Sequence, residues 1–262
     1  MKAIAVFGRK GGSGKTLVSH MLSHGMSMLG YTVVMLQTDV RTNRPPDLVE
    51  GRDYFLASTR GDQTDTDFLL KTFDRTAGMK NSILVIDGGA NRRNIDLVLT
   101  PLSDLILVPT GYSCEDVQVA EADFWELTGK LQEAKSEAEV FVLMNRWPGL
   151  YRKLQQVQQK PWVKEFITRT ERQRCLFPFF IPDMPSLLDM ANSEAPKTTP
   201  LIDGKARSFA TFVARKLGLM EGGSEMSPSA FEMAFEEEEE GGSSSAAAAA
   251  MPSRDFVLAK AS

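Results

Sequence analysis

A glycine-rich segment near the N-terminus, residues 8–16, constrains the fold of this chain more than any other feature. It follows an apolar run at residues 3–7, which predicts a buried strand, and precedes residues 17–29, where apolar side chains recur at helical spacing. A glycine-rich turn between a strand and a helix brings backbone N–H groups and the positive end of a helix dipole together. The segment therefore predicts a phosphate-binding loop at the edge of a sheet.

The side chains of this loop fit nucleotide binding. Lys15 supplies a mobile positive charge, and the hydroxyl of Thr16 can ligate Mg²⁺. The strict P-loop pattern has a glycine where this chain has Arg9, which weakens the match, although Lys10 makes up for the loss. The residues expected to contact the nucleotide here are Gly11, Gly12, Ser13, Gly14, Lys15, Thr16 and Leu17.

The run from Lys10 to Thr16 resembles the deviant P-loop, KGGxGK(S/T), of the ParA/MinD family of ATPases. The resemblance implies binding of ATP with Mg²⁺ and an ATP-dependent homodimer. It also implies a division of labour, in which Lys15 contacts the phosphates of its own chain and Lys10 reaches across the dimer to the partner's phosphates. We therefore expect an ATP hydrolase, closest to the ParA-like partition ATPases.

Alternating strand and helix patterns continue after the loop and predict one P-loop NTPase domain over residues 1–220. Strands are expected at 32–36, 82–86, 105–108, 140–144 and 176–181, and helices at 117–132, over much of 150–174 with a break at Pro161, and at 201–219. Continuous apolar strands between helices indicate an α/β fold with a mostly parallel sheet and helices on both faces. Ligands of such sheets bind at the carboxyl ends of the strands.

Two aspartates at strand ends are candidates for the chemistry. Asp87 occupies the Walker B position, where a carboxylate can hold Mg²⁺ together with Thr16. Asp39 resembles the water-positioning aspartate of the family pattern DxDPQxN, of which only Asp39 and Asn43 remain. Hydrolysis is therefore expected to be slow without a partner. A turn or helix-cap role stays open for both aspartates.

Three residues resemble the base-binding side of the family. Asn145 and Arg146 match an NR pair whose asparagine recognises adenine, and the segment from Pro178 to Pro182 lies where a later loop beside the adenine is expected, with Pro178 as the candidate contact. Residues 109–116 resemble the loop that runs along the dimer face. Asparagine and proline also end strands for backbone reasons, so the order of these matches, rather than any one of them, makes the resemblance specific.

Basic side chains are concentrated at residues 146–174, where eight lysines and arginines accompany two glutamates. Such a surface favours phosphate backbones without reading sequence, and the resemblance implies nonspecific DNA binding by the ATP-bound dimer. Arg169, Arg172 and Arg174 are the candidate contacts, although a solvated helix face explains the same charges. We expect association with the nucleoid and an activating ParB-like adaptor protein.

The composition changes towards the C-terminus. Residues 221–262 carry a net charge of −7, against +3 for residues 1–220, and contain runs of five glutamates and five alanines. They predict an acidic, low-complexity tail that is mostly disordered. The two cysteines, Cys114 and Cys175, have no metal-ligand spacing, and no apolar run predicts a signal peptide or membrane helix. We therefore expect a cytoplasmic location.

Other functions stay open. A MinD-like membrane switch would need a basic amphipathic C-terminal helix, whereas Phe231, Met233 and Phe235 lie beside five glutamates that an anionic bilayer repels. We therefore do not expect membrane binding. A metabolic P-loop enzyme, such as an ATP-dependent amide synthase, would need further acid–base groups, and none stands out. A nucleotide-gated interaction protein with little turnover is the third alternative.

Overall fold

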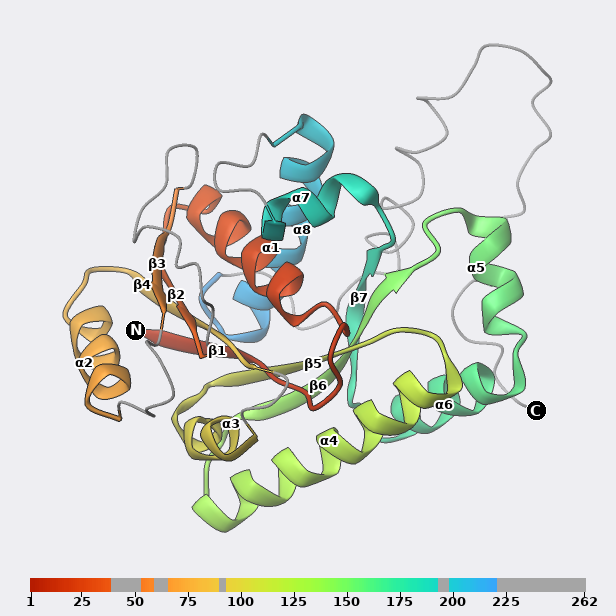
Figure 1. Cartoon of the computed structure of the whole chain (residues 1–262), viewed down its shortest axis with the longest axis horizontal. Coiled ribbons are helices and arrows are strands. Elements are labelled where there is room, and N and C mark those ends of the chain that lie inside the picture. The colour runs from red at the N-terminus through yellow and green to blue at the C-terminus, as the bar shows by residue number, and fades with distance from the viewer. Residues whose placement is uncertain (39–52, 59–65, 90–92, 193–197, 221–262) are drawn as a thin grey trace. The chain divides into compact units, whose positions relative to one another are not determined.

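The computed structural model describes residues 1–38, 53–58, 66–89, 93–192 and 198–220. Within them, seven strands form one parallel sheet in the order β3-β2-β4-β1-β5-β6-β7 (Figure 1). The strands are β1 (Lys2–Val6), β2 (Thr32–Gln37), β3 (Phe55–Ser58), β4 (Ser82–Asp87), β5 (Leu105–Thr110), β6 (Glu139–Trp147) and β7 (Leu176–Pro182). The predicted fold class, a P-loop NTPase fold with a parallel sheet, is confirmed.

Helices cover both faces of the sheet. Figure 1 shows α1, α7 and α8 on one side and α3 and α4 on the other. The helices are α1 (Lys15–Met28), α2 (Thr66–Ala77), α3 (Arg93–Leu99), the 3-10 helix η1 (Thr100–Leu102), α4 (Cys114–Ala134), α5 (Tyr151–Gln158), α6 (Pro161–Arg172), α7 (Pro185–Asn192) and α8 (Pro200–Lys216). The predicted break at Pro161 is confirmed, because this proline is the first residue of α6. In the described part of the chain, no helix is long and apolar enough to cross a membrane.

The central strands are apolar throughout because helices cover both of their faces. Every residue of β4 and β5 is buried, as are the last four residues of β1. The register pairs Val6, at the end of β1, with Asp87 of β4 and Leu107 of β5. The segment that follows β1 therefore starts beside the carboxyl end of β4.

Helix α1 packs closely against α8. The two helices approach so closely that a Cβ on Gly25 would lie 2.1 Å from the carbonyl oxygen of Ala206. One residue earlier, the ring of His24 lies 3.1 Å from Oδ1 of Asp53 and 2.8 Å from Oδ1 of Asp203. Burial by itself lowers the pKa of His24, but the hydrogen bonds to the two carboxylates outweigh it and raise that pKa above its ordinary value. These contacts fix the helix that begins at the phosphate loop.

Candidate nucleotide-binding site

The glycine-rich loop leaves β1 and enters α1 at Lys15. Gly14, the residue before the helix, has a φ of 87°, in the left-handed region that suits glycine. A Cβ on Gly14 would lie 2.2 Å from Nδ2 of Asn145, so the position needs glycine for space as well. Gly14, as the N-cap residue, makes no side-chain hydrogen bond to α1, and the first turn of the helix holds no acidic residue. An N-terminus of this kind can hold an anion on its backbone N–H groups and dipole, as the predicted phosphate site requires.

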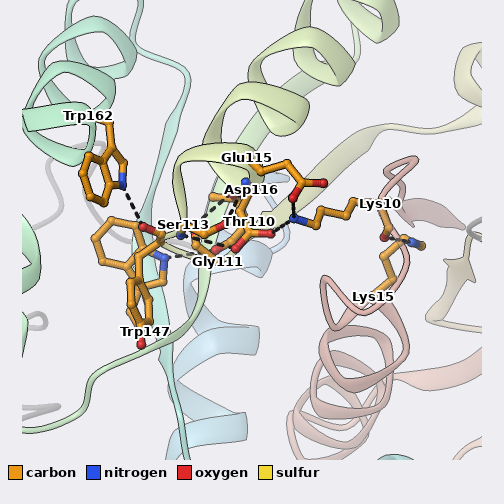
Figure 2. A network of polar contacts seen from close by, with 10 residues as sticks. Lys10, Lys15, Thr110, Gly111, Ser113, Glu115, Asp116, Trp147 and Trp162 are labelled. Atoms are coloured by element: carbon orange, nitrogen blue, oxygen red, sulfur yellow. Dashed lines mark hydrogen bonds and ion pairs between the residues drawn. The ribbon is translucent and has the colours of Figure 1, made fainter. Parts of the chain in front are cut away.

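The two lysines of the loop point in different directions. Lys15 is buried, and its Nζ donates to the carbonyl oxygen of Lys10 at 3.0 Å. Lys10 instead reaches to the start of α4, where its Nζ lies 2.6 Å from Oδ1 of Asp116 and 3.4 Å from Oε2 of Glu115 (Figure 2). The hydrogen bond to Asp116 raises the pKa of Lys10. Burial raises the pKa of Asp116, but its hydrogen bonds to Lys10 and Ser113 outweigh burial and lower it.

A buried aspartate compensates for Arg9 at the first glycine position of the P-loop pattern. Asp123 of α4 accepts the backbone N–H of Arg9 at 2.8 Å and pairs with Nε of the same residue. It also lies within 3.5 Å of the place that a Cβ on Gly8 would take. Asp123 could not be selected from the sequence, because only the packing of α4 beside β1 brings this carboxylate to the loop.

Asp87 lies where the Walker B prediction puts it, at the carboxyl end of β4, and only 1% of it is exposed. Its Oδ1 lies 3.2 Å from Oγ of Ser19, which is also 3.0 Å from the carbonyl oxygen of Lys15. Ser19 stands one turn after Lys15 in α1, and the sequence analysis did not select it. Thr16, the other expected Mg²⁺ ligand, is the second residue of the same helix. A buried carboxylate and a hydroxyl are oxygen ligands of the kind that Mg²⁺ prefers.

Thr38 joins the ends of β2 and β4. Its N–H and its Oγ1 lie 3.0 Å and 3.1 Å from the carbonyl oxygen of Asp87. The N–H of Gly89 in turn donates to Oγ1 of Thr38 at 3.2 Å. Asp39, the next residue after Thr38, lies outside the described residues, so its water-positioning role stays a prediction.

Asn145 presents a buried acceptor beside the loop. Its Nδ2 donates to the carbonyl oxygen of Ser13 at 2.7 Å, and among the described residues its Oδ1 has no hydrogen-bond partner. Arg146 has a φ of 60°, and its Cδ would lie 3.8 Å from a Cβ on Gly14. Buried carbonyl groups are normally paired, so the Oδ1 of Asn145 fits a ligand that brings an N–H donor, such as the exocyclic amine of adenine.

The segment expected beside the adenine, residues 178–182, lies mostly within a strand. Pro178 is inside β7, two residues before Phe180, which pairs with Met144. Pro182 is the partner of Trp147 at the carboxyl end of the strand, so this end of the segment lies at the edge of the sheet where ligands bind. A contact of Pro178 with the nucleotide stays a prediction.

The loop between β5 and α4 connects this site to α6. The indole N–H of Trp162 donates to the carbonyl oxygen of Tyr112 at 3.1 Å, and that of the buried Trp147 donates to Thr110 at 3.0 Å (Figure 2). The Nζ of Lys160 lies 5.1 Å from the centre of the Tyr112 ring. The loop that leads to Asp116, the partner of Lys10, is thus attached to the basic segment at residues 146–174.

The three arginines predicted to bind DNA differ in their surroundings. Arg169 forms a two-point ion pair with Glu121 of α4, at 3.0 and 2.9 Å, and contacts Glu165 at 2.6 Å. Counting charges along the sequence missed Glu121, because it comes from another helix. Arg172 and Arg174 are exposed at the C-terminal end of α6, and neither forms an ion pair with another described residue.

Comparisons with known proteins agree with this fold. The chain matches no family model, and no curated protein matches it. Among solved structures, MinD of Aquifex aeolicus, a cell division protein, is 19% identical, with a TM-score of 0.58 over 86% of this chain and 100% of that chain. A plasmid partition protein of Borrelia burgdorferi bound to AMPPNP is 15% identical, with a TM-score of 0.56 over 82% and 99%.

A metabolic enzyme shares the fold as well. Cobyrinic acid a,c-diamide synthase of Mycobacterium smegmatis, with bound ADP and magnesium, is 14% identical, with a TM-score of 0.59 over 83% of this chain and 96% of that chain. The three proteins place the chain in the P-loop NTPase fold.

Proposed function

We propose that this chain is a ParA-like ATPase that dimerises on ATP, binds DNA without sequence preference and is reset when an adaptor protein stimulates hydrolysis. The observation that carries the proposal is the divergence of the two loop lysines. Lys15 is buried against its own loop, while Lys10 extends over the surface to α4. A lysine that leaves its own phosphate site is suited to contact the phosphates of a second chain.

The surroundings of the loop support ATP as the nucleotide. Phosphates would bind the N-terminus of α1 and the charge of Lys15. The Oδ1 of Asn145, which has no hydrogen-bond partner among the described residues, would accept a hydrogen bond from the exocyclic amine of adenine. Asp87 and Thr16 would hold Mg²⁺, which neutralises the phosphate charge when bound. Ser19 would keep the Asp87 carboxylate in place. Asp39 stays the candidate that positions the attacking water.

The DNA-binding part of the proposal rests on the end of α6. Arg172 and Arg174 are exposed, and a dimer would present two copies of each to one duplex, which raises avidity without new contacts. Arg169 contributes less, because Glu121 and Glu165 already neutralise its guanidinium group. The surface reads no bases, so the proposed binding is independent of sequence.

The nucleotide part is tested with Lys15→Ala and Lys10→Ala in AMPPNP. Lys15→Ala should abolish nucleotide binding, because it removes the charge that neutralises the phosphates. Lys10→Ala should still bind nucleotide but fail to dimerise in sedimentation velocity runs. A wild-type protein that remains a monomer in saturating AMPPNP would refute the proposed ATP-dependent dimer.

The DNA part is tested by salt titration of binding to two unrelated duplexes. The double variant Arg172→Glu, Arg174→Glu should weaken binding about equally on both duplexes and flatten the salt dependence. Arg169→Glu is compared with the single variant Arg172→Glu, which changes the charge equally, and should have the smaller effect of the two. Equal salt slopes for wild type and double variant would mean that Arg172 and Arg174 do not contact DNA phosphates and are simply solvated side chains.

Two alternatives have structural neighbours of the same fold. A MinD-like function predicts binding to anionic vesicles, and an amide synthase predicts ATP turnover that depends on a small carboxylate substrate rather than on DNA. Vesicle sedimentation, and phosphate release with and without DNA, separate both alternatives from the proposed function.

A further inference from the structure

The ion pair between Lys10 and Asp116 is built on a carboxylate that is already fixed in place. Oδ2 of Asp116 accepts the backbone N–H of Ser113 at 3.3 Å, and the Ser113 hydroxyl accepts the N–H of Asp116, which together form a capping box at the start of α4. Asp116 also packs on Gly111, where a Cβ would lie 2.5 Å from its Oδ2. Its Oδ1 is left for Lys10 (Figure 2).

A second carboxylate of α4 binds the neighbouring cation of the loop in a different way. Asp123 stands two turns after Asp116, so the two side chains leave the helix on the same face. Asp123 is buried and holds the backbone N–H of Arg9 as well as its side chain, so this contact cannot open without moving the loop itself. Lys10 and Asp116 meet only through side chains that are 26% and 22% exposed. Their pair can therefore separate by rotation of the Lys10 side chain alone.

We propose that the Lys10–Asp116 ion pair is an autoinhibitory latch, which keeps Lys10 on its own chain until a second, ATP-bound copy of the chain arrives. The inference rests on the proposed function, in which Lys10 contacts the partner's phosphates. A dimer with two ATP molecules then has to open one latch on each chain. The Arg9–Asp123 pair stays closed and keeps the loop in place while Lys10 changes partner.

The size of the effect follows from the partial exposure of the pair. An ion pair that water can reach changes an equilibrium about 1.4- to 5-fold, and a dimer opens two of them. Removing the latch should therefore strengthen ATP-dependent dimerisation by about 2- to 25-fold. Glu115 is 77% exposed and 3.4 Å from Lys10, so it should contribute little of this effect.

The experiment measures the dimer dissociation constant by sedimentation velocity in saturating AMPPNP. Asp116→Asn removes the charge but keeps an oxygen that can accept the Ser113 N–H, so the start of α4 is conserved. Glu133→Gln is the matched control, because it removes the same charge from the same helix and breaks only an exposed pair with Lys130. Asp116→Asn should dimerise more tightly by the stated factor, and Glu133→Gln should match the wild type.

A second measurement needs no nucleotide. In the latch, Asp116 holds Lys10 in its charged form, so Asp116→Asn should make Lys10 react with acetic anhydride about 1.4- to 5-fold faster, as read by peptide mass mapping. If the wild type dimerises and Asp116→Asn dimerises equally or more weakly, the latch is wrong and the proposed function stands. If the wild type does not dimerise, the proposed function is wrong, and unchanged acetylation of Lys10 would also exclude the ion pair. Should Asp116→Asn fail to fold, the same two measurements on Asp116→Glu, whose longer side chain displaces the carboxylate, decide the question.

Discussion

Replacing Gly25 with alanine should destabilise the protein, although alanine is the better helix former. Gly25 is buried in α1 at the point where this helix meets α8. Gly204 offers the matched control, because it lies within α8 and is exposed, and outside its own stretch of helix no described atom lies within 4 Å of the position that a Cβ would take. The two substitutions are chemically identical and differ only in what the added methyl group meets.

The magnitude follows from the distances at the helix crossing. A Cβ on Gly25 would lie 2.1 Å from the carbonyl oxygen of Ala206 and 2.8 Å from Cβ of Ala210. Backbone atoms cannot rotate away, so α1 and α8 would have to separate by about 1 Å to restore van der Waals contact. Overpacking of this kind costs about 1 to 3 kcal/mol or more, against a gain of about 1 kcal/mol in helix propensity. Gly204→Ala has only the gain in helix propensity, which should raise the free energy of unfolding by about 0.5 to 1 kcal/mol.

Urea unfolding followed by circular dichroism measures both variants. We expect the free energy of unfolding to separate them by about 1 to 3 kcal/mol, with Gly25→Ala below the wild type and Gly204→Ala above it. In thermal scans the same difference is about 2 to 12 °C for a domain of this size. A Gly25→Ala variant as stable as Gly204→Ala would show that α1 and α8 do not approach as closely as described.

Three further predictions concern single side chains. His24→Asn should lower the free energy of unfolding by about 1 kcal/mol at pH 6 and by less at pH 9. Because the pKa of His24 is raised in the folded protein, its contribution to stability is complete below the ordinary pKa of histidine and is lost as the pH rises through the folded pKa. Equal losses at both pH values would contradict the charged pair. Burial raises the pKa of Cys175 to about 11, so a thiol reagent should label only Cys114 in the native protein and both cysteines in urea, and two fast thiols would contradict this burial. Ser19→Ala should reduce stability by about 1 kcal/mol, because the buried Asp87 carboxylate loses a donor, and an unchanged midpoint in urea would argue against that contact.

The positions of six of the strands along the chain and of the phosphate loop could be predicted because they follow from local patterns. Continuous apolar runs mark buried parallel strands, and glycines between a strand and a helix mark the loop. β3 has only four residues, and its apolar run is too short to distinguish a strand from part of a loop or helix. The short helices α3 and α7 carry too few turns for a periodic pattern to be distinguished from a loop.

The site residues that could be predicted belong to a sequence motif or end a strand. The residues that were missed reach the site only because the folded chain packs their helices against it. Lys15, Asp87 and Asn145 could be selected because strand ends and the glycine pattern fix their positions along the sequence. Ser19 could have been found from its place one turn after Lys15, on the helix face turned to the loop. Asp123 could not be found from the sequence, because 114 residues separate it from Arg9. Its helix also contains several other acidic residues, and the sequence does not show which of these side chains is buried.

Helix α4 is the element that joins the separate parts of this site. It carries Asp123 under Arg9, Asp116 at Lys10 and Glu121 at Arg169, all within eight residues. Along a helix that rises 1.5 Å per residue, these carboxylates span about 10 Å, which is short enough for a helix to behave as a rigid body. The replacement of a loop glycine by Arg9 is therefore more than a tolerated departure from the motif. Arg9 attaches the phosphate loop to α4, the same helix that pairs with Lys10 and contacts the basic helix α6. A displacement of α4 at one of these three contacts would therefore move its carboxylates at the other two.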